Sequence, residues 1–257
     1  MRLIPALILL AAASPAIAQD PNEDWDLTAN AERQLTLATL DFGDNVLALR
    51  CQAGTLDLLL TGVPVSTGPT RSAVVSAGAI GEETQIWSAL PGQPVIGADE
   101  PARLARQLRA GGPLDVRLAP EDAADRPRRY QLTAPPSERA VNAVLTACGE
   151  PLDEPRDLIA RLSPGNGPSW AAQPIPAFPD NPVAIAAERA GVNLSCIVGP
   201  DLGLTDCRVE AESPTGAGFG ASALRSARDA RLNPPADGTD IRGQMLRFTM
   251  RFEPHTD

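Results

Sequence analysis

The sequence predicts an α+β protein with two domains. A β-rich domain with two helices is expected over residues 22–160, and an α-β-β-α-β domain with a three-stranded antiparallel sheet over residues 183–255. Several short segments alternate apolar and polar residues, which is typical of half-buried strands. Helical segments open with capping residues and close at glycine. A proline-rich stretch, residues 163–182, separates the two groups of elements and predicts an extended linker.

One hairpin is expected in the first domain, from residues 45–52 and 55–62 around a two-residue Ala-Gly loop. The register of such a loop makes one face of the hairpin wholly apolar. On the other face it sets Arg50 opposite Asp57, which is a favourable cross-strand pair. Two independent patterns therefore agree on one register. Further strands are expected at residues 72–77, 84–90, 114–118 and 130–133.

Two helices are expected in the same domain, one opening at residues 99–101 and one at residues 137–138. The second helix places Cys148 on its apolar face, and the first hairpin directs Cys51 inward. A disulfide between Cys51 and Cys148 is the natural pairing. It would close a loop of roughly 100 residues and stabilise the fold by a few kcal/mol.

A second hairpin is expected at residues 192–210, with a Gly-Pro-Asp-Leu-Gly turn and one cysteine in each arm. A turn centred between residues 201 and 202 sets Cys196 directly opposite Cys207. In the same register Val198 faces Thr205 and Leu194 faces Val209. Opposed Cβ atoms on antiparallel strands lie about 4.5–5.5 Å apart, close enough for a disulfide after a modest adjustment. The alternative is two free thiols in a core hairpin.

The residues after this hairpin resemble a known family. The segment CIVGPDLGLTDCRVEAESPTGAGFGASAL, residues 196–224, is followed by a helix to about Leu232, an Asp-Gly turn and an alternating last strand. This order is similar to the C-terminal domain of TonB-family energy transducers, over about the last third of the chain. Phe178-Pro179 also resembles the Tyr-Pro that precedes the first helix of the family's domain. The departures are Asp-Leu-Gly in place of a plain Asp-Gly at the turn, and a longer segment between Phe178 and the hairpin. The N-terminal half has a pattern-level similarity to periplasmic domains of the invasion-associated locus B type.

The TonB resemblance implies that the domain binds an extended peptide by adding it to a sheet edge, and that the last strand is this edge. The implied partner is a peptide of an envelope or outer-membrane protein, such as a TonB-dependent receptor. The last strand, Leu246–Phe252, directs Arg247, Thr249 and Arg251 outward, so these are the candidate partner-binding residues. Two arginines in an acidic protein suit a peptide that bears carboxylates. The alternative is that they keep an open face soluble.

The first residues predict export. An arginine, a short apolar run and Ala16-Ile17-Ala18 before Gln19 are typical of a cleaved signal peptide, residues 1–18. The apolar run is shorter than the 20 residues or so that span a bilayer, so no membrane anchor is expected and the motor role of TonB is not carried over. An even number of cysteines, four, fits an oxidising compartment. The expected location is the periplasm, and the oligomeric state stays open.

Several functions are disfavoured. A net charge of −10 and a pI near 4.7 argue against nucleic acid as a partner. The single histidine, His255, lies three residues from the end, which disfavours a triad hydrolase and a zinc site. The glycine-rich residues 216–220 lack the lysine of a phosphate loop and are interpreted as a turn that feeds a helix. No cofactor, no metal and no enzymatic activity are expected.

Two hypotheses remain from the sequence. The first is a soluble periplasmic binding module with a TonB-like C-terminal domain. The second is a structural or stress protein of the cell envelope that acts through its N-terminal domain. Trp170 in the linker is either a docking residue or a side chain packed on one of the domains.

Overall fold

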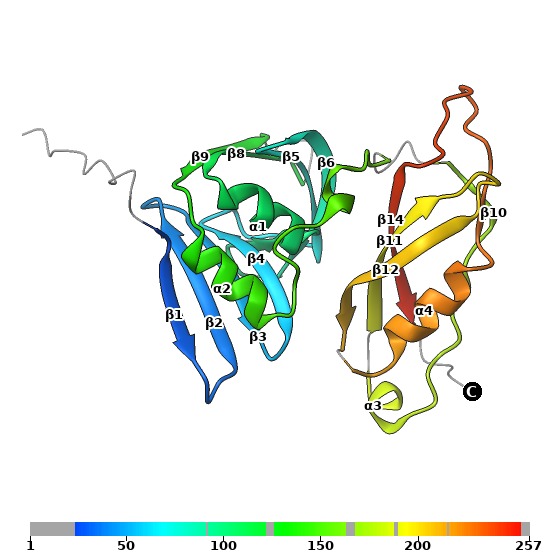
Figure 1. Ribbon diagram of the computed structural model, residues 1–257, viewed down its shortest axis with the longest axis horizontal. Helices are drawn as coiled ribbons and strands as arrows, with labels where there is room; N and C mark the ends of the chain where they lie inside the picture. The colour runs from blue at the N-terminus through cyan, green and yellow to red at the C-terminus, as the bar shows by residue number, and fades with distance from the viewer. Residues whose placement is uncertain are drawn as a thin grey trace, which may run out of the picture.

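A computed structural model describes residues 24–90, 92–121, 126–162, 168–187, 190–214 and 216–252 of the 257-residue chain. The expected signal peptide, its cleavage point and His255 lie outside these ranges. Figure 1 shows two bodies joined by a connecting segment, and each body is built around its own sheet.

The predicted α+β class is wrong. Within the described residues the chain is mostly β, with 44% strand and 16% helix, arranged as one large antiparallel sheet of nine strands and two small sheets. The sequence prediction missed a whole hairpin at residues 26–41 and several short strands. The strand propensity of each of these segments alone is weak, and pairing with neighbouring strands stabilises them as strands.

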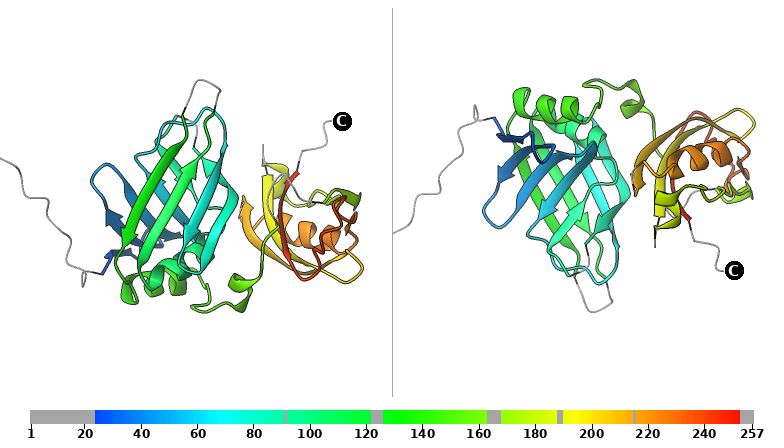
Figure 2. Two further views of the ribbon diagram at one scale, coloured as in Figure 1. Left: turned by 90° about the horizontal axis from the view of Figure 1, so that it is seen from above. Right: turned by 90° about the horizontal axis from the view of Figure 1, so that it is seen from below.

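The N-terminal domain contains the nine-stranded sheet, in the order β1-β2-β3-β4-β7-β6-β5-β8-β9. Its helices α1 and α2 pack together over the sheet (Figures 1 and 2). The sheet curls around its core, and the Trp25 indole N–H before β1 donates to the Pro135 carbonyl oxygen after β9, at 3.3 Å. The elements of this domain are β1 (Asp26–Asn30), β2 (Leu35–Asp41), β3 (Val46–Gln52), β4 (Thr55–Thr61), β5 (Thr70–Ala77), β6 (Ile80–Ala89), β7 (Val95–Gly97), α1 (Pro101–Arg109), β8 (Gly112–Leu118), β9 (Arg128–Ala134) and α2 (Arg139–Ala147).

The expected register of the first hairpin is confirmed. Arg50 of β3 lies opposite Asp57 of β4, and their side chains form an ion pair at 2.6 Å. The other face of the hairpin packs in the core of the domain, where all its residues are buried except Leu56, which is partly buried. A disulfide joins Cys51 to Cys148 directly after α2, with the two Cα atoms 5.5 Å apart. This bond ties the helix to the sheet, as the sequence predicts.

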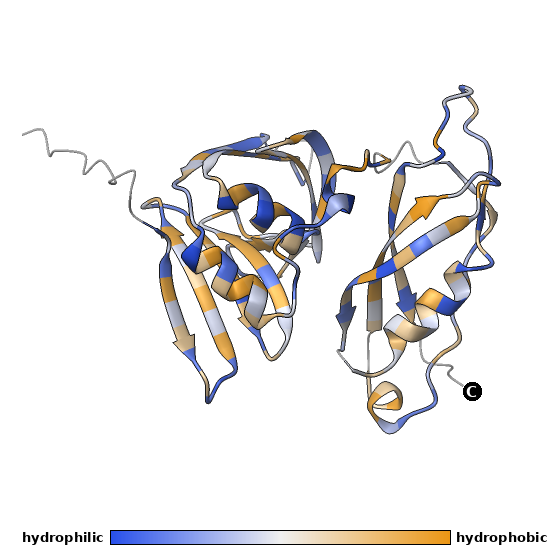
Figure 3. Ribbon diagram, in the orientation of Figure 1, coloured by the Kyte–Doolittle hydropathy of each residue, from blue (hydrophilic) through white to orange (hydrophobic). Residues whose placement is uncertain are grey.

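The C-terminal domain contains a three-stranded antiparallel sheet in the order β12-β11-β14 and a small sheet of β10 and β13. Helix α4 packs on one face of the three-stranded sheet (Figure 1). Apolar and polar residues alternate along the strands, as Figure 3 shows, so that one face is buried. The elements after the short connecting helix η1 (Pro155–Leu158) are β10 (Trp170–Ala172), α3 (Pro182–Ile185), β11 (Ala190–Val198), β12 (Leu204–Ser213), α4 (Phe219–Ala227), β13 (Arg231–Leu232) and β14 (Met245–Phe252).

The second hairpin keeps its expected register at Leu194, which lies opposite Val209, and departs from it nearer the turn. Val198 pairs with Leu204 and not with Thr205, because the pairing shifts along the hairpin. Asp206 has a φ of 43°, which is unusual for a residue other than glycine and marks the irregular position on β12. Sequence periodicity does not reveal a single inserted residue of this kind.

A second disulfide links Cys196 to Cys207 across this hairpin, with the Cα atoms 4.0 Å apart. All four cysteines are therefore bonded, one pair in each domain. Two disulfides fit a protein exported to an oxidising compartment. In the part of the chain that the structure describes, no helix is long and apolar enough to cross a membrane.

Candidate functional site

The free edge of β14 is the first candidate site. β14 is the last strand in the order β12-β11-β14, so only one of its edges is paired within that sheet. Met245 shows which backbone groups face the free edge: its N–H donates to the Ala160 carbonyl at 2.8 Å, and its carbonyl accepts from the Leu162 N–H at 2.9 Å. Backbone groups alternate sides along a strand. The N–H and C=O groups of Arg247, Thr249 and Arg251 therefore point to the same free edge.

Two of the three predicted partner-binding residues are exposed there. Thr249 and Arg251 are solvent-exposed, and the Thr249 hydroxyl donates to the Asn193 side-chain carbonyl at 2.7 Å. Beyond Met245, no hydrogen bond joins the outward backbone groups of β14 to any residue in the described ranges. This stretch of edge therefore offers unsatisfied donors and acceptors to another strand.

Arg247, the third predicted residue, lies in a different environment. Its guanidinium contacts Asp99 at 2.5 Å and Glu100 at 3.3 Å, and its side chain is 14% exposed. Both carboxylates belong to the N-terminal domain, at the start of α1. Burial raises the pKa of Asp99, and the adjacent Arg247 opposes this shift without cancelling it. Arg247 therefore joins the two domains, and Arg251 is the exposed arginine of this edge.

Glu100 is the centre of a charged network between the domains. This side chain is 5% exposed and contacts the guanidinium groups of Arg103 and Arg161 at 3.2 Å, in addition to Arg247. Burial alone would raise the pKa of Glu100, but the three guanidinium groups outweigh it and lower the pKa below its ordinary value. Glu100 is therefore ionised at neutral pH. It holds together arginines from α1, from β14 and from residues 155–162, the segment that connects the domains.

The linker between the domains in the structure is residues 155–162, before the proline-rich stretch at residues 163–182, and it is fixed on both sides. On the N-terminal side, Arg106 of α1 donates two hydrogen bonds to the Asp157 carboxylate, at 2.6 and 2.9 Å. On the C-terminal side, Arg156 donates to the Ser195 hydroxyl at 3.2 Å and to the Asp206 carbonyl at 3.0 Å. Arg156 and Asp157 are neighbours on η1, so one short helix connects α1 to the three-stranded sheet.

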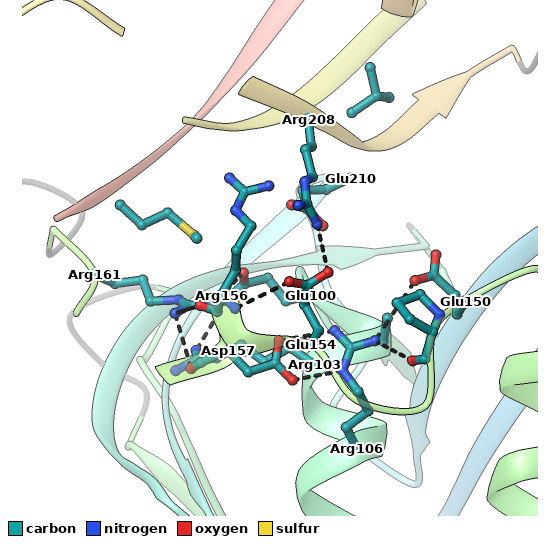
Figure 4. Close-up of a pocket in the computed structure, with 14 residues that line it drawn as sticks. Glu100, Arg103, Arg106, Glu150, Glu154, Arg156, Asp157, Arg161, Arg208 and Glu210 are labelled. Atoms are coloured by element: carbon teal, nitrogen blue, oxygen red, sulfur yellow. Dashed lines mark hydrogen bonds and ion pairs between the residues drawn. The ribbon is translucent and has the colours of Figure 1, made fainter. Parts of the chain in front are cut away.

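A polar cavity of about 240 Å³ lies between the linker and the two domains. Figure 4 shows that Arg208 and Glu210 approach it from the C-terminal domain, and Arg103 and Arg106 from the N-terminal domain. The charged residues that line it are Glu100, Arg103, Arg106, Glu150, Glu154, Arg156, Asp157, Arg161, Arg208 and Glu210.

Sequence reasoning did not find this network or the cavity. The sequence predicts Glu100 at the start of a helix, and the structure confirms this helix. The Glu100 carboxylate, however, makes contacts between the domains. Trp170 packs against Phe248 of β14, with ring centroids 5.3 Å apart, so its packed interpretation is confirmed. Within the described ranges, no group of three or more metal-ligating side chains is arranged to hold a metal ion.

Fold and site together define a two-domain, disulfide-bonded β protein with an open strand edge and a charged interface between its domains. The chain matches no protein-family model, and no curated protein and no solved structure is significantly similar to it. The similarity of residues 196–224 to TonB-family domains therefore stays a prediction from the sequence.

Proposed function

We propose that the chain is a periplasmic binding module whose C-terminal domain recognises an extended peptide by strand addition to β14. The observation that carries the proposal is the outward backbone of this strand. At Met245 the linker already occupies the edge with two backbone hydrogen bonds. The alternating geometry continues through Arg251, where an incoming peptide would find the same donors and acceptors.

The TonB-like motif supports the same binding mode, and it suggests a segment of an outer-membrane receptor as the partner. The charge of the edge favours a peptide with carboxylates near Arg251. Arg247 does not add to this preference, because Asp99 and Glu100 neutralise it. The proposal concerns binding and does not include energy transduction.

The decisive substitution is Thr249→Pro, which removes one backbone donor from the middle of the free edge. Because this N–H points away from β11, the domain should stay folded while peptide binding weakens by about tenfold or more. Labelled TonB-dependent receptor peptides and envelope extracts supply the ligands. Fluorescence polarisation measures affinity for the peptides, and a pull-down measures retention of envelope proteins.

Two matched variants separate the possible causes. Thr249→Ala removes the hydroxyl bond to Asn193 and keeps the backbone donor, so its binding should equal that of the wild type. Phe248→Pro removes a donor that faces β11, so it should unfold the domain. If Thr249→Pro folds and binds like the wild type, strand addition at β14 is wrong.

A further inference from the structure

The polar cavity between the domains suggests a second binding site that strand addition does not use. Pockets at domain boundaries are frequent ligand sites. Among the ten charged residues that line this cavity there are five arginines and five carboxylates, so the lining is formally neutral. Some of these side chains have donors or acceptors that no described residue satisfies, and these atoms indicate what kind of ligand the cavity would accept.

Three of the arginines keep unused donors, among them Arg161, whose Nε has no hydrogen-bond partner among the described residues. In Arg156, whose side chain is 9% exposed, Nη2 makes all the hydrogen bonds and Nη1 donates to no described residue. Nε lies 3.4 Å from the Asp206 carboxylate but makes no hydrogen bond to any described residue. Arg208 donates through Nη1 to Glu154 at 2.6 Å, and its Nη2 has no acceptor in the described ranges. Arg208 is 47% exposed, so water reaches its guanidinium. The buried guanidinium of Arg156, with its unused N–H groups, favours an anionic partner such as a carboxylate.

Two of the carboxylates keep unused acceptors. Glu210 accepts the Ser195 hydroxyl through Oε1, and its Oε2 accepts from no described residue. Glu150 lies 3.8 Å from the nearest nitrogen of Arg106, which is longer than a hydrogen bond. Burial raises the pKa of Glu150, and Arg106 only partly opposes this shift. A cationic group placed between Glu150 and Glu210 would satisfy both.

We propose that this cavity binds a small zwitterion with one carboxylate and one ammonium group, the chemistry shared by free amino acids and short peptides. Its carboxylate lies against Arg156 and Arg208, and its ammonium group against Glu150 and Glu210. A volume of about 240 Å³ corresponds to roughly eight molecules of liquid water, enough for an amino acid or a dipeptide. The proposal does not rest on strand addition, because Arg247, Thr249 and Arg251 of β14 do not line the cavity.

Isothermal titration calorimetry on the full chain tests the charge requirement. The probes are L-alanine and L-alanyl-L-alanine, and the one that binds identifies the source of the zwitterion. N-acetyl-L-alanine lacks the cation and L-alaninamide lacks the anion. Each should bind at least about tenfold more weakly than the zwitterion, because it loses a charge-assisted contact. No binding of either zwitterion in the millimolar range, or equal binding of the blocked compounds, would overturn the proposal.

Variants locate the site. Glu210→Gln keeps an acceptor for Ser195 and removes the charge, and Arg208→Gln removes a donor, so each should weaken zwitterion binding by about tenfold. Glu82→Gln and Arg117→Gln make the same changes in a surface ion pair of the N-terminal domain and should bind like the wild type. If the Glu210 and Arg208 variants also retain wild-type affinity, the ligand binds elsewhere and the assignment is wrong. The blocked-probe comparison uses the wild type, so it holds even if a variant fails to fold.

Discussion

Replacing Glu100 with glutamine tests whether the charged network holds the two domains together. Glutamine preserves the volume of the side chain and removes the anion that three guanidinium groups share. Two of these arginines have a second carboxylate within reach, since Arg103 contacts Glu83 at 2.6 Å and Arg247 contacts Asp99 at 2.5 Å. The change therefore affects the three arginines unequally.

The loss of stability expected for Glu100→Gln depends mainly on Arg161. Its side chain is 7% exposed, and Glu100 is the only described carboxylate that pairs with it. After the substitution it keeps hydrogen bonds to three backbone carbonyls but has no counter-charge. Leaving one buried charge unpaired costs about 3–5 kcal/mol. Because the carbonyls partly compensate, we expect the free energy of unfolding to fall by about 3 kcal/mol.

Urea denaturation of the wild type and the variant measures this difference, with Glu82→Gln as the control. Glu82 forms an ion pair with Arg117 but is 67% exposed, so its loss should cost less than about 1 kcal/mol. The pKa of Glu100 is lowered from 4.5, so its contribution is present above pH 4.5 and is lost as the pH falls through the folded-state pKa. Equal losses for both variants, or a difference that grows on acidification, would refute this account of the network.

Three further variants probe the two domains. Replacing both members of a disulfide with serine should destabilise the chain by about 5 kcal/mol for Cys51–Cys148 and about 3 kcal/mol for Cys196–Cys207, since the closed loops differ in length. Denaturation curves measure both losses, and a larger loss for the short loop would contradict the loop-entropy argument. Phe219→Ala should cost about 3–5 kcal/mol, because this fully buried ring contacts Phe178 and Phe252. A thermal melt with a near-wild-type midpoint would show that the aromatic cluster does not stabilise the domain.

The features that were predicted correctly are those set by the alternation of apolar and polar residues within a single helix or strand. The β3–β4 register was predictable because the apolar face and the Arg50–Asp57 pair each require the same alignment. The Cys51–Cys148 bond followed from two independent inward assignments. The predicted pairing of Val198 was wrong, since a bulge changes the register without changing the composition of either strand. The predicted fold class was wrong because several short strands are stable only beside their neighbours in the sheet.

The network between the domains could not be predicted from the sequence. Its members lie far apart in the chain, as in the hydrogen bond between Arg161 and Glu100, which spans 61 residues. Nothing in the alternation of β14 distinguishes Arg247, which faces the N-terminal domain, from Arg251, which faces solvent. That difference depends on how the two domains pack against each other, and the positions of charged residues along one strand give no information about this packing.

The placement of the linker changes how the proposed peptide edge should be understood. Residues 160–162 pair with Met245, so the beginning of β14 is closed to a partner and the accessible edge starts at Arg247. The same linker carries Arg156 and Arg161, which hold the charged network. A peptide that extended past Arg247 would therefore have to displace the linker from Met245 and disturb the contacts between the domains. Under the proposed strand addition, the N-terminal domain should limit peptide length on that side, and this limit would give the domain a direct role in recognition at the edge.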